Sequence, residues 1–496
     1  MRNRLLIFVL LAAVHAEDSH TQEVRAVLDE AAAVLGAAAL ESIRITGWGS
    51  DYVFGQAYDG RSPWPRFHVL EYELAIDYEL ASLRDARRRA QAEDPPLGGG
   101  FQPLVGEQHP IVLLSGGYAW DLDEGTVIPA EPERDLRSAV EGRTTQIWMT
   151  PHGFIKAARA GSPTMRTRQV LGETETVIAV TLPGGIALEG ELGSDRRVAR
   201  VTTWMPNAIL GDIALEAVYS GYQDFDGVSV PTRIVQRQAG FPLLDIHVTG
   251  VEINAVAPLS VPEAIRRQAP PARFVSSPEQ LAPGVWNIPL GSRDRSVVVE
   301  FSDYLVVFDT PVERAGVTEV GLEAIRRQWP NTPIRYVINT HTHFDHAAGL
   351  RAYAAEGATV ITHESNVGYY QQAWSNPRSL APDRLARSSR TPAFEGVVGS
   401  RTLTDGRRQL EIHHYPGNMH HPGLLLAYLP AERMLLQADS FNPASAYGGR
   451  PPAMPNLLHF YAAIERLKLD VEHIVPVHGR ITTMDELRLV IDRYGG

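Results

Sequence analysis

The stretch His341-Thr342-His343-Phe344-Asp345-His346 places four metal-capable side chains within six residues. Neutral imidazole is the commonest transition-metal ligand in proteins, and it suits zinc. Residues 334–340 before it are rich in β-formers, and residues 347–355 after it have a helical composition. We therefore predict that this hexapeptide lies on a strand-to-helix loop, where open α/β sheets keep their sites. The alternative is a histidine-rich surface loop that binds nothing.

The composition limits what else the chain can be. It has 496 residues, of which 44% are hydrophobic, and this length predicts two or three domains. A net charge of −12 and the lack of a block rich in Lys and Arg argue against nucleic acid as the substrate. There is no cysteine, so the chain has no disulfides, and any metal site must be built from histidine and carboxylate.

The N-terminus has the pattern of an export signal. Met1-Arg2-Asn3-Arg4 is basic, Leu5 to Val14 is apolar, and Val14-His15-Ala16 resembles a small-residue cleavage site. These features predict a signal peptide over residues 1–16 and a periplasmic or secreted protein. The apolar run is too short to span a bilayer, and no later segment is long and apolar enough to cross one. We therefore expect no stable membrane anchor after the signal peptide is removed.

Residues 21–265 are predicted to form a mostly antiparallel β domain, because short β-branched and aromatic runs alternate with turn residues. The clearest predicted strands are 111–114, 174–180, 198–204 and 245–251. Helices are predicted over 23–40 and 84–92. A curved sheet of this kind is compatible with a scaffold that grips an apolar molecule, but also with a spacer or an oligomerisation module.

A Pro-rich linker at residues 269–272 precedes the second half, residues 274–496. Here strands and helices alternate, which is typical of an α/β domain. The predicted strands are 296–301, 304–308, 334–339, 359–362, 424–428, 434–436 and 473–477, and the predicted helices are 317–327, 347–355 and 457–467.

Three further polar residues lie just after or between β-like segments of this half, on predicted loops. His420 lies in Gly417-Asn418-Met419-His420, Asp439 follows the run 434–438, and His478 precedes Gly479. Eleven of the seventeen histidines fall between His341 and His478, so histidine is concentrated where the hexapeptide lies.

From about Phe274 to the C-terminus, these motifs resemble the metallo-β-lactamase superfamily of hydrolases. The family carries His-x-His-x-Asp-His after a strand, then a His after a Gly-containing loop, an Asp at a strand end and a His before Gly. Asp309-Thr310-Pro311 also resembles its early Asp motif. The resemblance implies an αβ/βα sandwich with the site along one edge, behind an N-terminal domain of unspecified family.

The resemblance also implies a ligand set for two zinc ions per chain. A first metal would be held by His341, His343 and His420, a second by Asp345, His346 and His478, with Asp439 bridging them. A metal-bound hydroxide would then be the nucleophile, because zinc lowers the pKa of bound water to about 7. Asp345 is also the candidate catalytic residue, since a carboxylate can orient the nucleophile or take its proton. Many true β-lactamases of the family have Cys or Ser where this chain has Asp439, which favours its other branches.

Other residues near these motifs have less distinctive interpretations. His363 is expected to have a structural role, and Asp309 is a candidate for orienting a ligand histidine. His421 is expected at the surface, and Tyr447 is a candidate substrate contact. The stretch 365–400 is either a roof over the site or a solvated helical insert.

The sequence thus predicts an exported dinuclear zinc hydrolase of a small-molecule ester, lactone, amide or thioester, with a β-lactam among the possible substrates. One alternative is a mononuclear Fe(II) enzyme of the same fold that oxidises sulfur compounds, since two histidines and a carboxylate can hold iron. Another is a binding protein whose N-terminal domain holds an apolar ligand. The substrate and the oligomeric state are not predicted.

Overall fold

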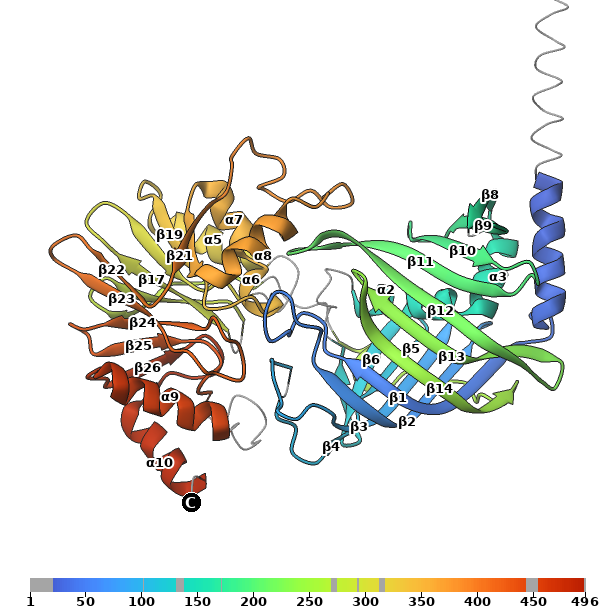
Figure 1. Cartoon of the computed structure of the whole chain (residues 1–496), viewed down its shortest axis with the longest axis horizontal. Coiled ribbons are helices and arrows are strands. Elements are labelled where there is room, and N and C mark those ends of the chain that lie inside the picture. Colours follow the sequence, from blue (N-terminus) through green and yellow to red (C-terminus); the bar gives the residue numbers. More distant parts are fainter. Residues whose placement is uncertain are drawn as a thin grey trace, which may run out of the picture.

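The computed structural model describes residues 21–100, 102–130, 138–170, 172–268, 274–291, 294–311, 317–442 and 454–494. The proposed signal peptide, the linker at 269–272 and Tyr447 lie outside them. Among the described residues, no helix is both long and apolar enough to cross a membrane. The chain forms an N-terminal region with one large sheet and a C-terminal region with two smaller ones (Figure 1).

The N-terminal sheet is antiparallel throughout, as predicted. Fourteen strands form it in the order β7-β6-β5-β3-β2-β1-β14-β13-β12-β11-β10-β9-β8, with β4 paired to β3. Their bounds are β1 Ser42–Tyr52, β2 Arg66–Asp77, β3 Ser82–Gln91, β4 Glu107–Gln108, β5 Ile111–Ser115, β6 Tyr118–Asp123, β7 Thr126–Pro129, β8 Thr164–Val170, β9 Glu173–Thr181, β10 Ala187–Leu192, β11 Val198–Asn207, β12 Gly211–Phe225, β13 Val228–Gln238 and β14 Phe241–Ile253.

Helices pack against this sheet, and their buried side chains form one hydrophobic core with those of the strands. Residues 21–35 are helical, so the helix predicted over 23–40 is confirmed but ends five residues earlier, before the turn at 36–39. Helices α2 (Ala139–Met149) and α3 (Pro151–Ala160) were not predicted, although Ser138 and Thr150 cap their N-termini in the usual way. Their apolar side chains pack with those of the strands into one cluster, with Leu28, Ile147, Phe154, Ile178 and Ile246 among its buried members. A short helix, α4 (Glu263–Arg266), follows the sheet.

The predicted helix at 84–92 is wrong, because this stretch is strand β3. Its composition of Arg, Ala and Gln favours helix, but pairing with β2 places alternate side chains on opposite faces of the sheet. On one face Arg87 bonds to Asp85 at 2.9 Å and reaches Asp51 at 3.3 Å. On the other face, Arg84 and Arg88 pair with acidic residues of β2. The strand is therefore stabilised by ion pairs that a helix would break.

The C-terminal region is a sandwich of two sheets, and the predicted strand–helix alternation is confirmed there. The first sheet has the order β15-β16-β17-β18-β19-β20-β21 and is parallel from β18 onward; the second has the order β22-β23-β24-β25-β26-β27. The bounds are β15 Glu279–Ala282, β16 Val285–Pro289, β17 Arg295–Glu300, β18 Leu305–Phe308, β19 Ile334–Ile338, β20 Thr359–His363, β21 Ala393–Val397, β22 Ser400–Thr404, β23 Gln409–His414, β24 Leu425–Leu429, β25 Met434–Gln437, β26 His473–Pro476 and β27 Thr482–Thr483.

Helices lie outside both sheets, which gives the order helix, sheet, sheet, helix (Figure 1). Alternation along β17 shows the layers, since Val298 packs with the helices on one side while Val297 and Val299 pack between the sheets. The helices are α5 Val317–Gln328, α6 Phe344–Ala347, α7 Leu350–Glu356 and α8 Glu364–Trp374 by the first sheet, and α9 Met454–Leu467 and α10 Met484–Tyr494 by the second. The fold is the αβ/βα sandwich that the resemblance implied.

The two regions are joined by specific contacts as well as by the chain. The guanidinium of Arg378 donates hydrogen bonds to the carbonyl oxygens of Asn207, the last residue of β11, and of Ala208 and Ile209 after it. Asp212 of β12 accepts hydrogen bonds from the backbone and hydroxyl of Ser379. The stretch 365–400 thus contains helix α8 and an inter-domain anchor, rather than being only a roof or a solvated insert.

Candidate metal centre

The hexapeptide lies at the carboxyl end of the parallel strand β19, as predicted. His341, Thr342 and His343 are on the loop after the strand, while Asp345 and His346 are on the single-turn helix α6. The Nδ2 group of Asn339 donates to the carbonyl oxygen of His341 at 2.7 Å, which tightens the bend between strand and loop. This part of the chain is deeply buried, with His341 and His346 fully inaccessible to solvent.

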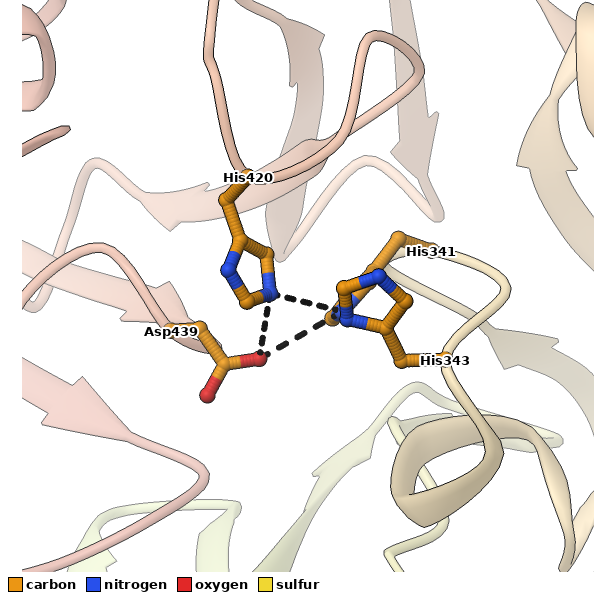
Figure 2. A group of neighbouring side chains, drawn as sticks. All are labelled: His341, His343, His420 and Asp439. Carbon is orange, nitrogen blue, oxygen red and sulfur yellow. Dashed lines mark hydrogen bonds and ion pairs between the residues drawn. The ribbon is translucent and has the colours of Figure 1, made fainter. Parts of the chain in front are cut away.

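A first group consists of His341, His343, His420 and Asp439, whose potential ligand atoms all lie within 4.8 Å of one another. The Nε2 atoms of His341 and His420 are 3.2 Å apart. The Oδ2 atom of Asp439 is 3.4 Å from the first of these nitrogens and 3.2 Å from the second. Figure 2 shows the three imidazole rings and the carboxylate gathered around a common centre.

A second group of the same kind consists of Asp345, His346 and His478. The Oδ2 atom of Asp345 lies 3.9 Å from Nε2 of His346 and 3.8 Å from Nε2 of His478. Asp439 connects the two groups, because its Oδ2 is also 2.8 Å from Nε2 of His346 and its Oδ1 is 3.6 Å from Nε2 of His478. All seven predicted ligand residues are therefore brought together, with Asp439 between the two sets.

In three of these histidines Nε2 faces the ligand groups and Nδ1 lies close to a protein oxygen. That contact selects the tautomer of the ring. His346 Nδ1 lies 2.7 Å from Oδ2 of Asp309, and the same oxygen accepts from the hydroxyl of Thr340 at 2.7 Å. The Thr340 oxygen in turn lies 2.9 Å from Nδ1 of His341. Asp309, which is fully buried, thus orients one histidine directly and another through Thr340, the role considered for it from the sequence. His478 Nδ1 has an equivalent partner in Asp294, which the sequence did not indicate.

The second group fits a metal cation. The Nδ1 hydrogens of His346 and His478 are donated to carboxylates, so both rings turn Nε2 towards the site, and these two nitrogens are only 3.0 Å apart. Burial opposes a charge on His346, yet Asp439, Asp309 and Asp345 raise its pKa well above 6.5. Positive charge is therefore favoured between these rings, as expected for a site that accepts a divalent cation.

The first group holds His341 and His343 in the neutral form that binds metal. Burial, reinforced by the neighbouring His420, lowers the pKa of His343 to about 3. Burial and the surrounding histidines also lower the pKa of His341 well below its usual value. The Nδ1 atom of His343 is buried and has no hydrogen-bond partner among the described residues, so its lone pair is available to a ligand of the site.

Other histidines near the site have structural roles. The expectation that His421 lies at the surface is wrong, because it is fully buried and its Nε2 is 2.9 Å from the hydroxyl of Thr342. This contact stabilises the loop that carries the hexapeptide. His363 caps helix α8 by accepting from the backbone N–H of Ser365, in agreement with a structural role. The hydroxyl of Tyr370 on α8 donates to Asn339 at 2.7 Å and so braces the end of β19.

The N-terminal region has a separate cavity of about 460 Å³ within the curve of its sheet. Apolar side chains such as Leu215 and Leu244 line one part of it. Asp51, Asp85 and Arg87, which form ion pairs with one another, line another part. Its wall is therefore amphipathic.

The C-terminal region is similar to known proteins. A family model described as the metallo-beta-lactamase superfamily matches residues 295–478. No curated protein matches the chain. Among solved structures, a metallo-beta-lactamase from Pontibacter korlensis is 19% identical, with 44% of this chain and 97% of that chain covered and a TM-score of 0.33. The metallo-beta-lactamase FIM-1 from Pseudomonas aeruginosa, in a mono-zinc form, is 16% identical. The match covers 45% of this chain and 96% of that chain, with a TM-score of 0.33.

A flavodiiron core, Flv1 from Synechocystis, is 18% identical, with 45% of this chain and 61% of that chain covered and a TM-score of 0.35. The family match begins at β17 and ends at His478, so it contains all seven residues of the two groups. The β-rich N-terminal region lies outside it. Over residues 295–478, this chain carries a domain of the metallo-β-lactamase superfamily.

Proposed function

We propose that this protein is an exported dinuclear zinc-dependent hydrolase that cleaves a small-molecule ester, lactone, amide or thioester. The observation that supports this most is the position of Asp439, whose carboxylate lies between two complete sets of ligand atoms. A single-metal site would not need the second set, Asp345, His346 and His478.

The donor atoms favour zinc chemistry. His341, His343 and His420 would hold one ion, Asp345, His346 and His478 the other, and Asp439 would contact both. Zinc, when bound, polarises a carbonyl oxygen and makes water nucleophilic at neutral pH, so no serine or cysteine nucleophile is needed.

Asp345 is suited to proton transfer as well as to metal binding. Its side chain is 24% exposed, whereas those of His346 and His478 are 0% and 10% exposed. A carboxylate that holds a site and also reaches solvent can accept a proton from the attacking water and release it. The proposed export rests on the signal-like residues 1–16.

The experiment that tests this proposal combines metal analysis with a substrate panel. Purified protein is analysed for zinc and iron, and about two zinc ions per chain are expected. Chromogenic esters, lactones and a cephalosporin are then assayed with and without chelator, and turnover of one class is expected to stop on chelation. One iron with oxygen uptake would instead support the sulfur-oxidising alternative, and no tightly held metal would support a binding protein.

A further inference from the structure

A loop of the N-terminal region reaches into the metal centre. It follows β1 and includes Gly55, Gln56 and Ala57, all of which are buried. The backbone N–H of Phe344, inside the hexapeptide, donates to the carbonyl oxygen of Gly55 at 3.0 Å. The centre is therefore bounded by residues that lie outside the matched family domain and almost three hundred positions earlier in the chain.

The carbonyl oxygen of Ala57 orients His343. It lies 2.9 Å from Nε2 of that histidine, a distance at which the ring must donate its hydrogen from Nε2. The lone pair is then left on Nδ1, which is buried and has no hydrogen-bond partner among the described residues, and His343 belongs to the first ligand group. Ala57 thus selects the tautomer of His343 in the way that Asp309 selects that of His346.

The side chain of Gln56 orients Asp345. Its Nε2 group donates to Oδ1 of the carboxylate at 2.7 Å, and Gln56 is only 4% exposed. The other oxygen, Oδ2, is the one that faces His346 and His478. The hydrogen bond therefore fixes the rotation of the carboxylate and leaves one oxygen for the second ligand group.

A second loop of the N-terminal region locks this arrangement. The N–H of Gly99 donates to the carbonyl of Gln56, and the N–H of Gly98 donates to the carbonyl of Met419, the residue before His420. The backbone of Gly99 lies very close to Gln56 and His343. A Cβ on Gly99 would lie 2.1 Å from Oε1 of Gln56 and 2.7 Å from Cε1 of His343. Only glycine fits there without moving a ligand histidine.

Aromatic packing keeps the first loop in place. The ring of Phe344 lies edge-on to Phe54 at 5.1 Å and to Trp64 at 5.7 Å between centroids. Trp64 and Phe344 are both buried, at 5% and 4% exposure. These contacts are apolar and involve no ligand side chain, so packing holds the loop against the hexapeptide.

We propose that the N-terminal domain completes the metal centre, with the amide of Gln56 and the carbonyl of Ala57 acting as positioning groups for Asp345 and His343. This inference rests on the proposed function, because it assumes that the two ligand groups bind metal. It assigns the β-rich domain a role in metal binding rather than that of a spacer.

The test compares full-length Gln56→Ala, Gln56→Glu and Gly99→Ala with wild type. Zinc affinity is measured by competition with a chromogenic chelator, and the visible spectrum of the cobalt-substituted protein reports ligand geometry. Loss of a hydrogen bond to a metal ligand typically lowers metal affinity about 10–100-fold, and we expect that loss for Gln56→Ala. Gln56→Glu, with the same shape but a repelling charge, should be at least as impaired, whereas a role in packing alone would tolerate it.

Two variants serve as matched controls. Gln146 also donates an amide hydrogen bond to a carboxylate, Asp85 at 2.8 Å, but it lines the N-terminal cavity, so Gln146→Ala should keep wild-type zinc affinity. Gly399→Ala adds a methyl group where no atom lies within 4 Å. Far-ultraviolet circular dichroism of the metal-free proteins shows that each variant has folded.

The outcomes separate this inference from the proposed function. Wild type that binds no metal would refute the proposed function. Wild type that binds two zinc ions, together with Gln56→Ala and Gln56→Glu of unchanged affinity and cobalt spectrum, would overturn only the role of the N-terminal domain. If one Gln56 variant fails to fold, the other decides, and a Gly99→Ala spectrum identical to that of Gly399→Ala would also count against the inference.

Discussion

The Nδ1 atom of His478 lies 2.6 Å from Oδ1 of Asp294, although the two residues are 184 positions apart. Their backbones also form an isolated antiparallel bridge, so the two residues are joined through the main chain as well as through their side chains. Asp294 fixes the ring with Nε2 towards the second ligand group. We predict that Asp294→Ala lowers the affinity for the second zinc ion about 10–100-fold, as measured by chelator competition.

The conservative change Asp294→Asn tests the cause. An amide keeps an oxygen that can accept from His478 but removes the charge, so its effect on affinity should be intermediate. The exposed Asp303 provides a control, since Asp303→Ala removes a carboxylate of the same domain away from the ligands. Equal affinities for all four proteins would contradict the assigned role of Asp294.

Single-ligand changes should separate the two metal sites. His478→Ala removes one ligand of the second group and leaves His341, His343 and His420 intact, so the protein should retain about one zinc per chain and lose its hydrolytic activity. His341→Ala should also abolish activity. The fold should stay largely intact, because His341 is not a member of a hydrophobic core cluster.

His473 is the matched control for the first of these, because it lies on β26 just before His478 but its side chain is 46% exposed. His473→Ala should keep both metals and full turnover. Elemental analysis and the substrate panel give both readouts. Unchanged turnover in His341→Ala would remove the proposed mechanism.

Much of the centre could be predicted from the sequence because its ligands are carried by local motifs. The density of ligands in the hexapeptide indicates metal binding by itself, and Asp439 and His478 each follow a predicted strand. His420 follows β23, which was not predicted, but its Gly-containing loop matches the family motif. Asp294 could not be found in this way, because it becomes a partner of His478 only when β17 and β26 are brought together. Gln56 and Ala57 were missed for the same reason, since their role depends on how the domains pack.

The errors in the fold have a related cause. Residues 84–92 have a helical composition but pair with β2, and tertiary contacts outweigh local preference there. Helices α2 and α3 were missed despite signals that were present, namely Ser138 as a cap and Thr150 before Pro151. Their buried side chains, among them Ile147 and Phe154, pack in one cluster with those of the strands.

Arg378 is predicted to hold the two domains together. Its side chain is 7% exposed and donates to three backbone carbonyl oxygens of the other domain. Arg378→Ala leaves these acceptors without their charged donor, so we expect the free energy of unfolding to fall by about 2–4 kcal/mol. Arg378→Lys should recover only part of this, since one ammonium group cannot reproduce the planar fork.

Denaturant unfolding, followed by tryptophan fluorescence, measures this loss. Arg384 is the control, because it lies in the same segment but is 42% exposed and pairs with the carboxylates of Glu319 and Glu356 in its own domain. Arg384→Ala should change the stability by no more than about 0.5 kcal/mol. A similar small effect of Arg378→Ala would show that the domains are held by other contacts.

Buried His152 should make the stability of the N-terminal domain depend on pH. It lies in the first turn of α3 with 2% exposure, and burial lowers its pKa from 6.5 to about 4. Between these two values the unfolded chain binds a proton that the folded chain does not, so stability falls as the pH is lowered through this window and is unaffected above it.

We therefore predict that His152→Gln reduces the loss of stability between pH 7 and pH 5 by about 2 kcal/mol, because 1.5 pH units of this window are crossed at about 1.4 kcal/mol each. Denaturant titrations of metal-free wild type and His152→Gln at both pH values measure the difference. In the absence of metal the ligand histidines contribute equally to the two proteins, so their titration cancels. His109→Gln, at a side chain that is 60% exposed, should keep the wild-type difference. If His152→Gln keeps it too, the imidazole is protonated in the folded state and the helix must accommodate a charge there.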